Sequence, residues 1–528
     1  MPKMFFPQYR RGRSGILVTE GTILDHARRL GVEIASECGG LGICGRCVVR
    51  IEKGAEFLTE RTAQEKRHSL LEAERLACQA KVLEPGGDIH VFIKDFGDYA
   101  ILSESRSADD VALEPYVTRD GKQVVHDSGE VLGPYEGEIY GLAVDLGTTT
   151  LVAQLVDLED GRTIATRARK NPQISYGNDV ISRIGYTMTH EGGLKELQSV
   201  VAEAINGLLE SMERDAGSVR RYVYDVVIVG NSTMRSIFFG QDVTSLGHIP
   251  FEPVSRDPVT ASASDLGLEI HPHARVYGGA LIGGHAGADA LADILASRMY
   301  EGRDVVMLID IGTNGEVALG NADKIMTASC AAGGAYEGAT TKCGVGAVAG
   351  AIKNVWISDD HVEYATIGGK PPVGICGSGL IDLLAELLRS GKMSQKAKLE
   401  REFFVTDGIS LSQEDVYQLI TAKAGLRLDQ DMLIKYYGVT LDDVSKIYLA
   451  GAFGNYINPQ SAVTIGLLPP AAEKIVRIGN AALEGAREML ISQRMRRKAE
   501  EIAEQVEHIK PNELEPDFPY LVAEKMYF

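Results

Sequence analysis

The pattern of apolar and polar positions divides the chain into two stretches of different texture. Within residues 1–95 the apolar runs are short: GTILDHARRLGVEI has the spacing of an amphipathic helix, while CVVRIEKG and DIHVFIK have the character of strands. From Ile139 onward, long apolar runs end abruptly at Asp or Gly and are followed by tight turns. The pattern therefore predicts a small mixed module followed by a larger α/β region.

The first part of the α/β region contains three expected strands and a helix. The run IYGLAVDLGTTTLVAQLVDLEDGRTIATRARK predicts three strands joined by tight turns. Apolar residues at helical spacing then predict a helix over residues 194–217. The sequence YVYDVVIVG predicts a buried strand that ends at Gly230.

The same order of elements returns later in the chain. Residues 303–330 again combine an apolar strand ending in an Asp-Gly-Thr turn with two further strands, and VSKIYLAG again ends a buried strand at Gly451. The distance from the aspartate to this glycine is longer in the second copy, which predicts an insertion there. Internal duplication is strong evidence of architecture. Two such units resemble the sugar-kinase, actin and heat-shock chaperone superfamily (ASKHA), whose fold binds ATP in the cleft between its halves.

The two copies each carry a candidate phosphate loop, DLGTTT at 145–150 and DIGTNGE at 310–316. An aspartate at the end of a strand can hold Mg²⁺ through water, and glycine lets the backbone approach a phosphate. One such turn could be an ordinary strand connection, but two in a duplicated context favour nucleotide binding. We expect Asp145 and Asp310 to position Mg²⁺ and Asn314 to orient the attacking water. The residues expected to surround the phosphates are Gly147, Thr148, Thr149, Gly312 and Thr313.

Two further glycine-rich segments are candidates for nucleotide contacts. The segment GAFGN at 451–455 resembles the adenosine-contacting motif of the superfamily, which implies that Gly451, Phe453 and Gly454 lie near the nucleoside. The segment GICGSGLID predicts a turn from a strand into a helix whose N-terminus, at Gly377, could help to hold nucleotide. A packing turn is an equal alternative for that second segment.

Four cysteines near the N-terminus have the spacing of a cluster site. Cys38, Cys44, Cys47 and Cys78 follow the pattern C-x5-C-x2-C-x30-C, within a loop rich in glycine. Four thiolates in this order can hold a [2Fe–2S] cluster, two on each iron. The alternative is free or zinc-bound cysteines, but zinc fingers prefer paired C-x2-C knuckles and the chain has one such pair. The loop resembles the adrenodoxin-like branch of the ferredoxins.

Four regions follow from these patterns. We expect a [2Fe–2S] ferredoxin-like domain at 1–95, a linker or small middle module at 96–138, a first ASKHA half at 139–302 and a second half with an insertion at 303–528. The C-terminal run EGAREMLISQRMRRKAEEIAEQVEHIK predicts a charged amphipathic helix packed on the core. The fold class is thus α/β, a β-grasp ferredoxin-like domain joined to a duplicated ASKHA ATPase.

Charge and composition restrict the partners and the compartment. The formal net charge is −19, which argues against nucleic acid as a partner. The sequence has no apolar run as long as a membrane span and no signal-peptide pattern at its start. The remaining three cysteines, Cys330, Cys343 and Cys376, are expected to be reduced and structural. We therefore expect a cytoplasmic protein without a membrane or nucleic-acid partner.

Beside the cluster module and the duplicated ATPase, the chain contains six further motifs: GNSTM (230–234), GGHAGADA (283–290), AAGGAYEGA (331–339), ICGSGLID (375–382), AGAFGNYINP (450–459) and IGLLP (465–469). Together these features resemble the reductive activators of corrinoid-dependent methyltransferases and of corrinoid iron–sulfur proteins. The chain departs from some relatives in one respect, since it has no cysteine after Cys376 for a C-terminal four-iron cluster.

The resemblance implies an ATP-dependent enzyme that reduces cob(II)alamin to cob(I)alamin on a corrinoid protein, either a cobalamin-bound methyltransferase component or a corrinoid iron–sulfur protein. Its cofactors would be a [2Fe–2S] cluster, ATP and Mg²⁺, with an external low-potential electron donor; a homodimer remains open. Three alternatives are a small-molecule kinase with a regulatory cluster, an activator of a radical dehydratase, and an actin-like or chaperone-like binding protein. A kinase would need a general base beside a substrate pocket, and the sequence offers no clear one.

Overall fold

The computed structural model describes residues 2–528 apart from positions 8–12, 33, 35, 37–39, 44, 46, 69, 71, 85, 94–110, 331–333, 337–340, 359–360 and 452–453; of Asn455 the backbone alone is described. The chain divides into two compact units. Unit 1 comprises Met1–Asp98 and Asn171–Ala204, and unit 2 comprises Tyr99–Lys170 and Ile205–Phe528. Each unit is described separately below.

The N-terminal part of unit 1 is one mixed sheet packed on a short helix. The sheet has the order β2-β1-β5-β3-β4, and β1 and β5 run parallel in it. The strands are β1 (Lys3–Phe6), β2 (Arg13–Ile16), β3 (Val48–Lys53), β4 (Glu74–Leu76) and β5 (Ile89–Ile93). The helix and the two strands expected from the sequence of this region are confirmed as α1 (Ile23–Arg29), β3 and β5.

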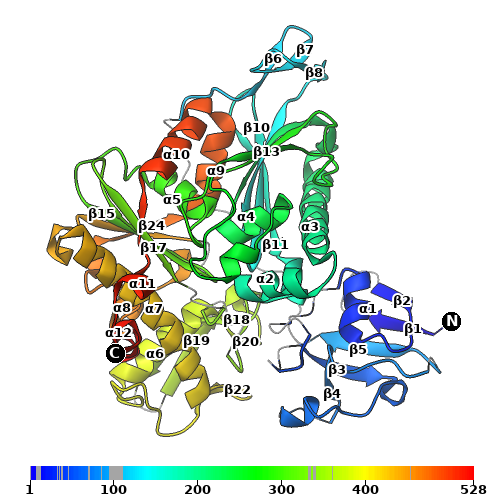
Figure 1. Cartoon of the computed structure of the whole chain (residues 1–528). Helices are drawn as coiled ribbons and strands as arrows, with labels where there is room; N and C mark the ends of the chain where they lie inside the picture. Colours follow the sequence, from blue (N-terminus) through cyan, green and yellow to red (C-terminus); the bar gives the residue numbers. More distant parts are fainter. Residues whose placement is uncertain are drawn as a thin grey trace. The chain divides into compact units, whose positions relative to one another are not determined.

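Helix α1 begins at a capping box. The Thr22 hydroxyl accepts from the Asp25 amide at 3.0 Å, and the Asp25 carboxylate accepts from the Thr22 amide at 2.9 Å. The apolar face of α1 places Ile23, Leu24 and Ala27 in a buried core. The second segment of unit 1 contributes η3 (Pro172–Ser175), α2 (Val180–Thr189) and the first part of α3 (Gly193–Ala216). Helices α2 and α3 are labelled in Figure 1.

Unit 2 contains two six-stranded sheets that share the topology of five strands; the sixth strand lies at opposite edges, β13 antiparallel to β14 in one sheet and β25 parallel to β17 in the other. The first has the order β11-β10-β9-β12-β14-β13 and the second β24-β23-β15-β16-β17-β25. In each sheet three consecutive strands form an antiparallel meander, and two later strands add in parallel beside the first of them. The duplication expected from the sequence is therefore present in the strand order.

The strands of the first sheet are β9 (Tyr140–Leu146), β10 (Thr150–Asp157), β11 (Thr163–Lys170), β12 (Val223–Val229), β13 (Val259–Ser262) and β14 (Arg275–Gly278). Those of the second are β15 (Val306–Ile311), β16 (Gly315–Gly320), β17 (Ile325–Cys330), β23 (Lys446–Ala450), β24 (Ile475–Gly479) and β25 (Glu507–His508). A long helix precedes the fourth strand of each copy, α3 before β12 and α7 (Gln413–Tyr437) before β23.

Two helices, α5 (Ala288–Ser297) and α9 (Ala481–Ile491), pack against each other between the sheets. Helix α5 follows β14 and helix α9 follows β24, and α5 also contacts β15 while α9 contacts β9. Each copy therefore contributes a helix that packs on the sheet of the other copy. One buried core includes residues from both copies.

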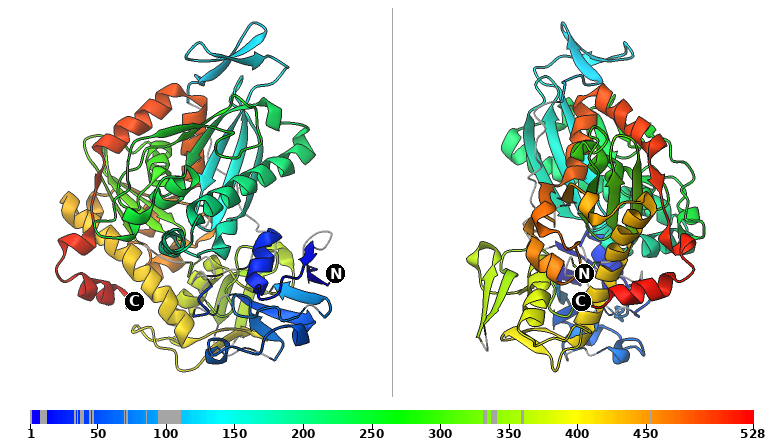
Figure 2. Two further views of the ribbon diagram at one scale, coloured as in Figure 1. Left: turned by 45° about the vertical axis from the view of Figure 1, so that its right-hand side comes forward. Right: turned by 90° about the vertical axis from the view of Figure 1, so that its left-hand side faces the viewer.

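The region expected to be a linker or a small module contains a small sheet within its described part. Strands β6 (Val117–Asp120), β7 (Gln123–His126) and β8 (Val131–Pro134) form an antiparallel sheet of their own. This sheet projects from the remainder of unit 2 in both views of Figure 2. The structure therefore favours the module over the linker for residues 117–134.

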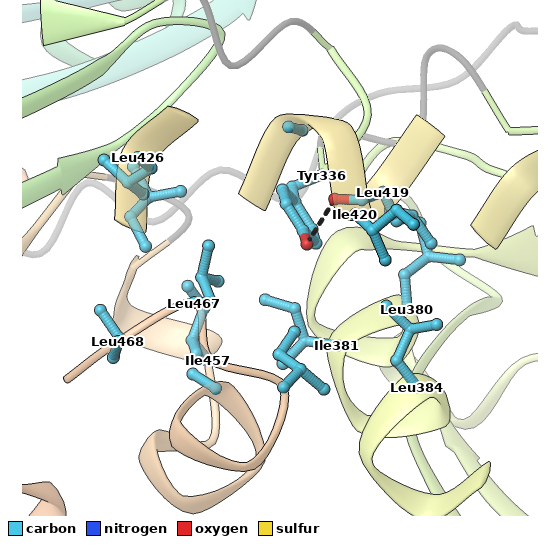
Figure 3. Close-up of a cluster of buried hydrophobic side chains, with 14 of the residues drawn as sticks. Tyr336, Leu380, Ile381, Leu384, Leu419, Ile420, Leu426, Ile457, Leu467 and Leu468 are labelled. Atoms are coloured by element: carbon cyan, nitrogen blue, oxygen red, sulfur yellow. Dashed lines mark hydrogen bonds between the residues drawn. The ribbon is translucent and has the colours of Figure 1, made fainter. Parts of the chain in front are cut away.

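The insertion expected in the second copy lies between β17 and α7. It contains β18 (Ala351–Ser358), β19 (His361–Thr366), β20 (Gly374–Ile375), α6 (Gly377–Arg389), β21 (Phe403–Thr406) and β22 (Ile409–Leu411). Side chains from α6, α7 and the segment around α8 (Pro459–Thr464) form a buried apolar cluster there (Figure 3). Within it, the Tyr336 hydroxyl donates to the Leu419 carbonyl at 2.9 Å.

The prediction of a single C-terminal helix is wrong. The run forms α9 and α10 (Gln493–Gln505), and it ends in β25. At the junction Ser492 has an extended backbone, φ −143° and ψ 115°, and it makes a parallel bridge with Glu114. All of α9 is buried, so this part of the run has no exposed polar face of the kind an amphipathic helix presents. The remaining helices are α4 (Ser232–Phe238), α11 (Pro511–Leu514) and α12 (Phe518–Lys525).

Candidate functional site: a nucleotide cleft and a cluster-binding module

The two predicted phosphate loops line one cleft in unit 2. Asp145 lies near the end of β9 and Asp310 near the end of β15, so the first strand of each meander carries one aspartate to the cleft. The lining includes all the residues proposed from the two loops: Asp145, Gly147, Thr148, Thr149, Asp310, Gly312, Thr313 and Asn314. Their roles stay predictions, but the structure brings them together.

Hydrogen bonds connect the loops with each other and with their supports. The Thr149 and Thr313 hydroxyls are 2.5 Å apart, which joins the two loops directly. Asn231, which caps α4, donates from Nδ2 to the Thr148 hydroxyl at 2.9 Å. Asn480, which caps α9, donates from Nδ2 to the Asp145 carboxylate at 2.9 Å.

Gly451 is required by the position of Asp310. Its backbone has φ +89°, and a Cβ there would lie 2.3 Å from the Asp310 Oδ1 atom. Any side chain at 451 would displace the carboxylate from the cleft. The glycine that ends β23 thus serves the phosphate loop of the neighbouring strand.

Burial raises the pKa values of the carboxyl groups that line the cleft. Burial raises the pKa of Asp145 to about 7, the Asn480 hydrogen bond opposes this, and the charge of Asp310 adds to it. The pKa of Asp289, on α5, is likewise raised to about 7 by burial. The pKa values of Asp310 and Glu316 are also raised, chiefly by burial. A divalent cation would relieve this crowding of carboxylates, so the donor set fits Mg²⁺.

The other predicted nucleotide residues are placed as follows. Gly377, at the start of α6, and Gly451 line the cleft, while Gly454 begins the turn η8 (Gly454–Tyr456) and is not among the lining residues. The prediction for Phe453 lies outside the described residues. Sequence reasoning missed Asn231, Asn480 and Tyr456, all of which line the cleft.

A sequence signal for the two asparagines existed. Each follows a glycine that ends or follows a buried strand, Gly230 before Asn231 and Gly479 before Asn480, and each caps the next helix. Helix capping alone accounts for an asparagine at such a position. The second hydrogen bond, into the phosphate loop, is visible in the structure alone.

Two of the four predicted cluster ligands are described, and they fit a shared metal. The Cys47 and Cys78 sulfurs are 3.3 Å apart and both residues are buried. A disulfide would need about 2.05 Å, whereas two thiolates on one tetrahedral metal lie roughly 3.8 Å apart. Gly40, Gly42 and Gly45 have φ of 107°, 75° and 69°, as a tightly turned cluster loop requires. The predictions for Cys38 and Cys44 lie outside the described residues.

The nucleotide cleft and the cluster-binding module together define a class of protein. A duplicated cleft with an aspartate from each copy is typical of an ATPase of the ASKHA type, and here it shares a chain with a module of the [2Fe–2S] ferredoxin kind. Three family models agree: the 2Fe-2S iron-sulfur cluster binding domain over residues 13–83, the RACo middle region over 140–302, and the C-terminal ASKHA domain of RACo over 304–527.

The chain belongs to the family of ATP-dependent activators of corrinoid proteins. It is 30% identical over 544 aligned positions to the corrinoid activation enzyme RamQ of Eubacterium limosum, covering 90% of each chain. It is 28% identical to the [Co(II) methylated amine-specific corrinoid protein] reductase of Methanosarcina barkeri, over 70% of this chain and 73% of the relative.

A solved structure, a reductive activator for corrinoid, iron–sulfur protein, matches over 100% of this chain and 98% of its own, with 28% identity and a TM-score of 0.74. The family resemblance and the fold class expected from the sequence are therefore confirmed, as are the expected cofactors, a [2Fe–2S] cluster, ATP and Mg²⁺. In the described part of the chain, every helix is too short or too polar to cross a membrane.

Proposed function

We propose that this protein is a cytoplasmic ATP-dependent reductive activator that converts cob(II)alamin to cob(I)alamin on a corrinoid protein. The observation that carries the proposal is the joint presence, in one chain, of paired cluster thiols and of a cleft lined by Asp145 and Asp310. The relatives named above act on corrinoid proteins, which supports a corrinoid protein as the partner here. An external low-potential donor would supply the electrons.

The energetics explain why such a chain needs a nucleotide. A plant-type [2Fe–2S] centre has a potential of about −400 mV, and cob(I)alamin is a stronger reductant still. For one electron, each unfavourable 59 mV costs roughly a factor of ten in the equilibrium. An ATPase that changes shape can bias a second equilibrium in the same complex.

The residues of the cleft have separate tasks in this proposal. Asp145 and Asp310 hold Mg²⁺ through water, and Asn480 orients the Asp145 carboxylate and favours its ionised form. Asn231 fixes the Thr148 hydroxyl, so that it is presented to phosphate in one orientation. Asn314 orients the attacking water.

The two threonines provide the link between the halves. The contact between Thr149 and Thr313 joins loops from both copies, and a phosphate entering between them would exchange that hydrogen bond for bonds to its own oxygens. A nucleotide that replaces this hydrogen bond therefore changes the contact between the two copies, as a conformational cycle requires.

The test is anaerobic spectroscopy of a corrinoid protein mixed with this protein, reductant and Mg·ATP. Cob(II)alamin should become cob(I)alamin only with all components present. The Asp310→Ala protein should lose about a hundredfold or more of its hydrolysis while keeping its iron and sulfide, because it loses a Mg²⁺-positioning carboxylate. The Cys78→Ser protein should keep its ATPase and lose reduction. Reduction at the same rate without ATP would refute the proposal.

A further inference from the structure

One cationic side chain stands among the acidic groups of the cleft. Lys353 is the single lysine, arginine or histidine among the described residues that line it, whereas Asp145, Asp289, Asp310 and Glu316 are all carboxylates. A nucleoside triphosphate brings several further negative charges, of which one Mg²⁺ neutralises a part. An anion with so few cations around it would be bound poorly in a buried site.

The strand that carries Lys353 is irregular at this residue. In the pairing of β18 with β19, Ile352 lies opposite Thr366 and Asn354 lies opposite Ala365, so Lys353 is the extra residue of a β-bulge. A bulge redirects a side chain, and bulges are common beside active sites. The flanking residues have other environments: Ile352 is in the apolar core, and Asn354 donates to the Asp382 carboxylate at 2.9 Å.

Residues at the start of α6 hydrogen-bond to two successive backbone carbonyls of the bulge. The Cys376 amide donates to the Ile352 carbonyl at 3.0 Å, and the Ser378 hydroxyl donates to the Lys353 carbonyl at 3.0 Å. Gly379 packs so closely that a Cβ there would be 2.2 Å from the Ile352 carbonyl oxygen. The backbone under Lys353 is therefore fixed, and the side chain is the part left to meet a ligand.

The Lys353 ammonium also lacks a partner within the described part of the chain. Neither a carboxylate within 4.0 Å nor a hydrogen-bond acceptor is found for it there, although its residue is half-buried. Other half-buried lysines of unit 2 have partners; Lys474 donates to three backbone carbonyls and Lys510 to a carbonyl and a carboxylate. Lys353 thus differs from these lysines, because its ammonium has no such partner among the described residues.

We propose that Lys353 binds the phosphate chain of the nucleotide. This inference rests on the proposal that the cleft is an ATP site, and it adds the residue that balances the charge of that site. A lysine ammonium donates up to three hydrogen bonds and suits phosphate oxygens in different positions. The expected consequence is that Lys353 contributes to the affinity for nucleotides that carry phosphates and not to the affinity for the nucleoside.

The test compares Lys353→Met, Lys353→Arg and Lys370→Met. Methionine keeps most of the apolar stem, and Lys370 is an exposed lysine that follows β19 and serves as the control. Binding of Mg·ATP, Mg·ADP and adenosine would be measured by calorimetry. We expect Lys353→Met to weaken Mg·ATP and Mg·ADP binding roughly tenfold to hundredfold, to leave adenosine unchanged, and to be largely rescued by arginine. Lys370→Met should match the unmodified protein.

A second measurement needs no substitution. An acylating reagent that attacks lysine amines should label Lys353 of the unmodified protein, as read by peptide mass spectrometry, and Mg·ATP should block this labelling while adenosine should not. Equal Mg·ATP affinity in Lys353→Met, or an equal loss for adenosine, would overturn the inference, as would labelling that Mg·ATP leaves unchanged. If the unmodified protein itself fails to bind Mg·ATP, the proposed ATPase function fails first, so the two failures are distinguishable.

Discussion

At the scale of single residues, the buried carboxylates of the cleft lower the stability of the nucleotide-free protein as they ionise. Burial raises the pKa of Asp145 from 3.8 to about 7, so the folded protein retains a proton that the unfolded chain releases at lower pH. The stability contributed by this proton is complete below pH 3.8 and is lost as the pH rises to about 7. Burial also raises the pKa values of Asp289 in the cleft and of Asp429 on α7, so both groups add to this dependence on pH.

We therefore expect the melting temperature of the nucleotide-free protein to fall by several degrees between pH 5 and pH 8. Mg²⁺ with a non-hydrolysable ATP analogue should restore much of the loss, because the cation neutralises the same carboxylates. Scanning calorimetry at several pH values measures both effects. The Asp145→Asn protein, which cannot ionise at this position, should show a shallower decline; an unchanged slope would exclude Asp145 as its origin.

Single residues also show where sequence reasoning ends. Asp145 and Asp310 could be predicted because each belongs to a motif that occurs twice. Asn480 could not, because its hydrogen bond joins residues 335 positions apart and its local role as a helix cap is complete without it. Tyr456 also lines the cleft. In its segment the prediction of nucleotide contacts followed the glycine motif and did not include this tyrosine.

At the scale of elements, a buried ion pair supports the strand that leads to Cys78. Glu65 accepts from Arg75 Nε at 2.8 Å and from the Leu76 amide at 3.0 Å, which fixes β4. Burial raises the pKa of Glu65, but its hydrogen bonds with Arg75 and backbone amides outweigh this and the net pKa is lowered. Removal of one partner would leave Arg75 buried without its counter-charge.

The Glu65→Ala protein should therefore lose stability in the ferredoxin-like module, by about 3 kcal/mol. Loss of the visible absorbance of the cluster on heating should occur at a lower temperature, while phosphate release stays normal. The control is Glu52→Ala, which removes an exposed ion pair with Arg50 in the same sheet and should change neither readout. An equal effect of both substitutions would argue against the buried pair as the support of β4.

The crossing of α5 and α9 permits a second element-scale prediction. Gly485 lies so close to α5 that a Cβ would be 2.2 Å from the Ala292 carbonyl oxygen. Gly485→Ala should push the helices apart, lower stability by about 1–3 kcal/mol and reduce ATP hydrolysis, because Asn480, which caps α9, donates to Asp145. Thermal unfolding and phosphate release measure this. Gly185→Ala, in α2 where the added Cβ meets nothing within 4 Å, should be neutral or stabilising.

Elements with a strong local pattern were predictable, and those set by distant contacts were not. The meanders β9–β11 and β15–β17 follow from apolar runs and turn residues. The break between α9 and α10 could not be predicted, because helical spacing continues through Ser492. What extends the backbone there is a bridge to Glu114, a residue far away in the chain.

At the scale of the whole molecule, the question is whether the cluster and the cleft of one chain must act together. The proposal requires that the partner receives its electron while the cleft is in the state that ATP produces. That state lasts only while nucleotide is bound. If a protein with a working cluster and another with a working cleft bound the partner one after the other, electron transfer and the ATP-induced state would occur at different times.

A mixing experiment tests this requirement. Equal amounts of Cys78→Ser, which lacks the cluster, and Asp310→Ala, which lacks hydrolysis, should together reduce cob(II)alamin on the corrinoid protein no faster than either alone. The unmodified protein at half the total concentration is the reference, and anaerobic absorbance of cob(I)alamin is the measurement. Restored reduction in the mixture would show that cluster and cleft act between chains, as a homodimer would allow. Because each variant keeps one half of the chemistry intact, failure of the mixture together with activity of the reference locates the coupling within a single chain.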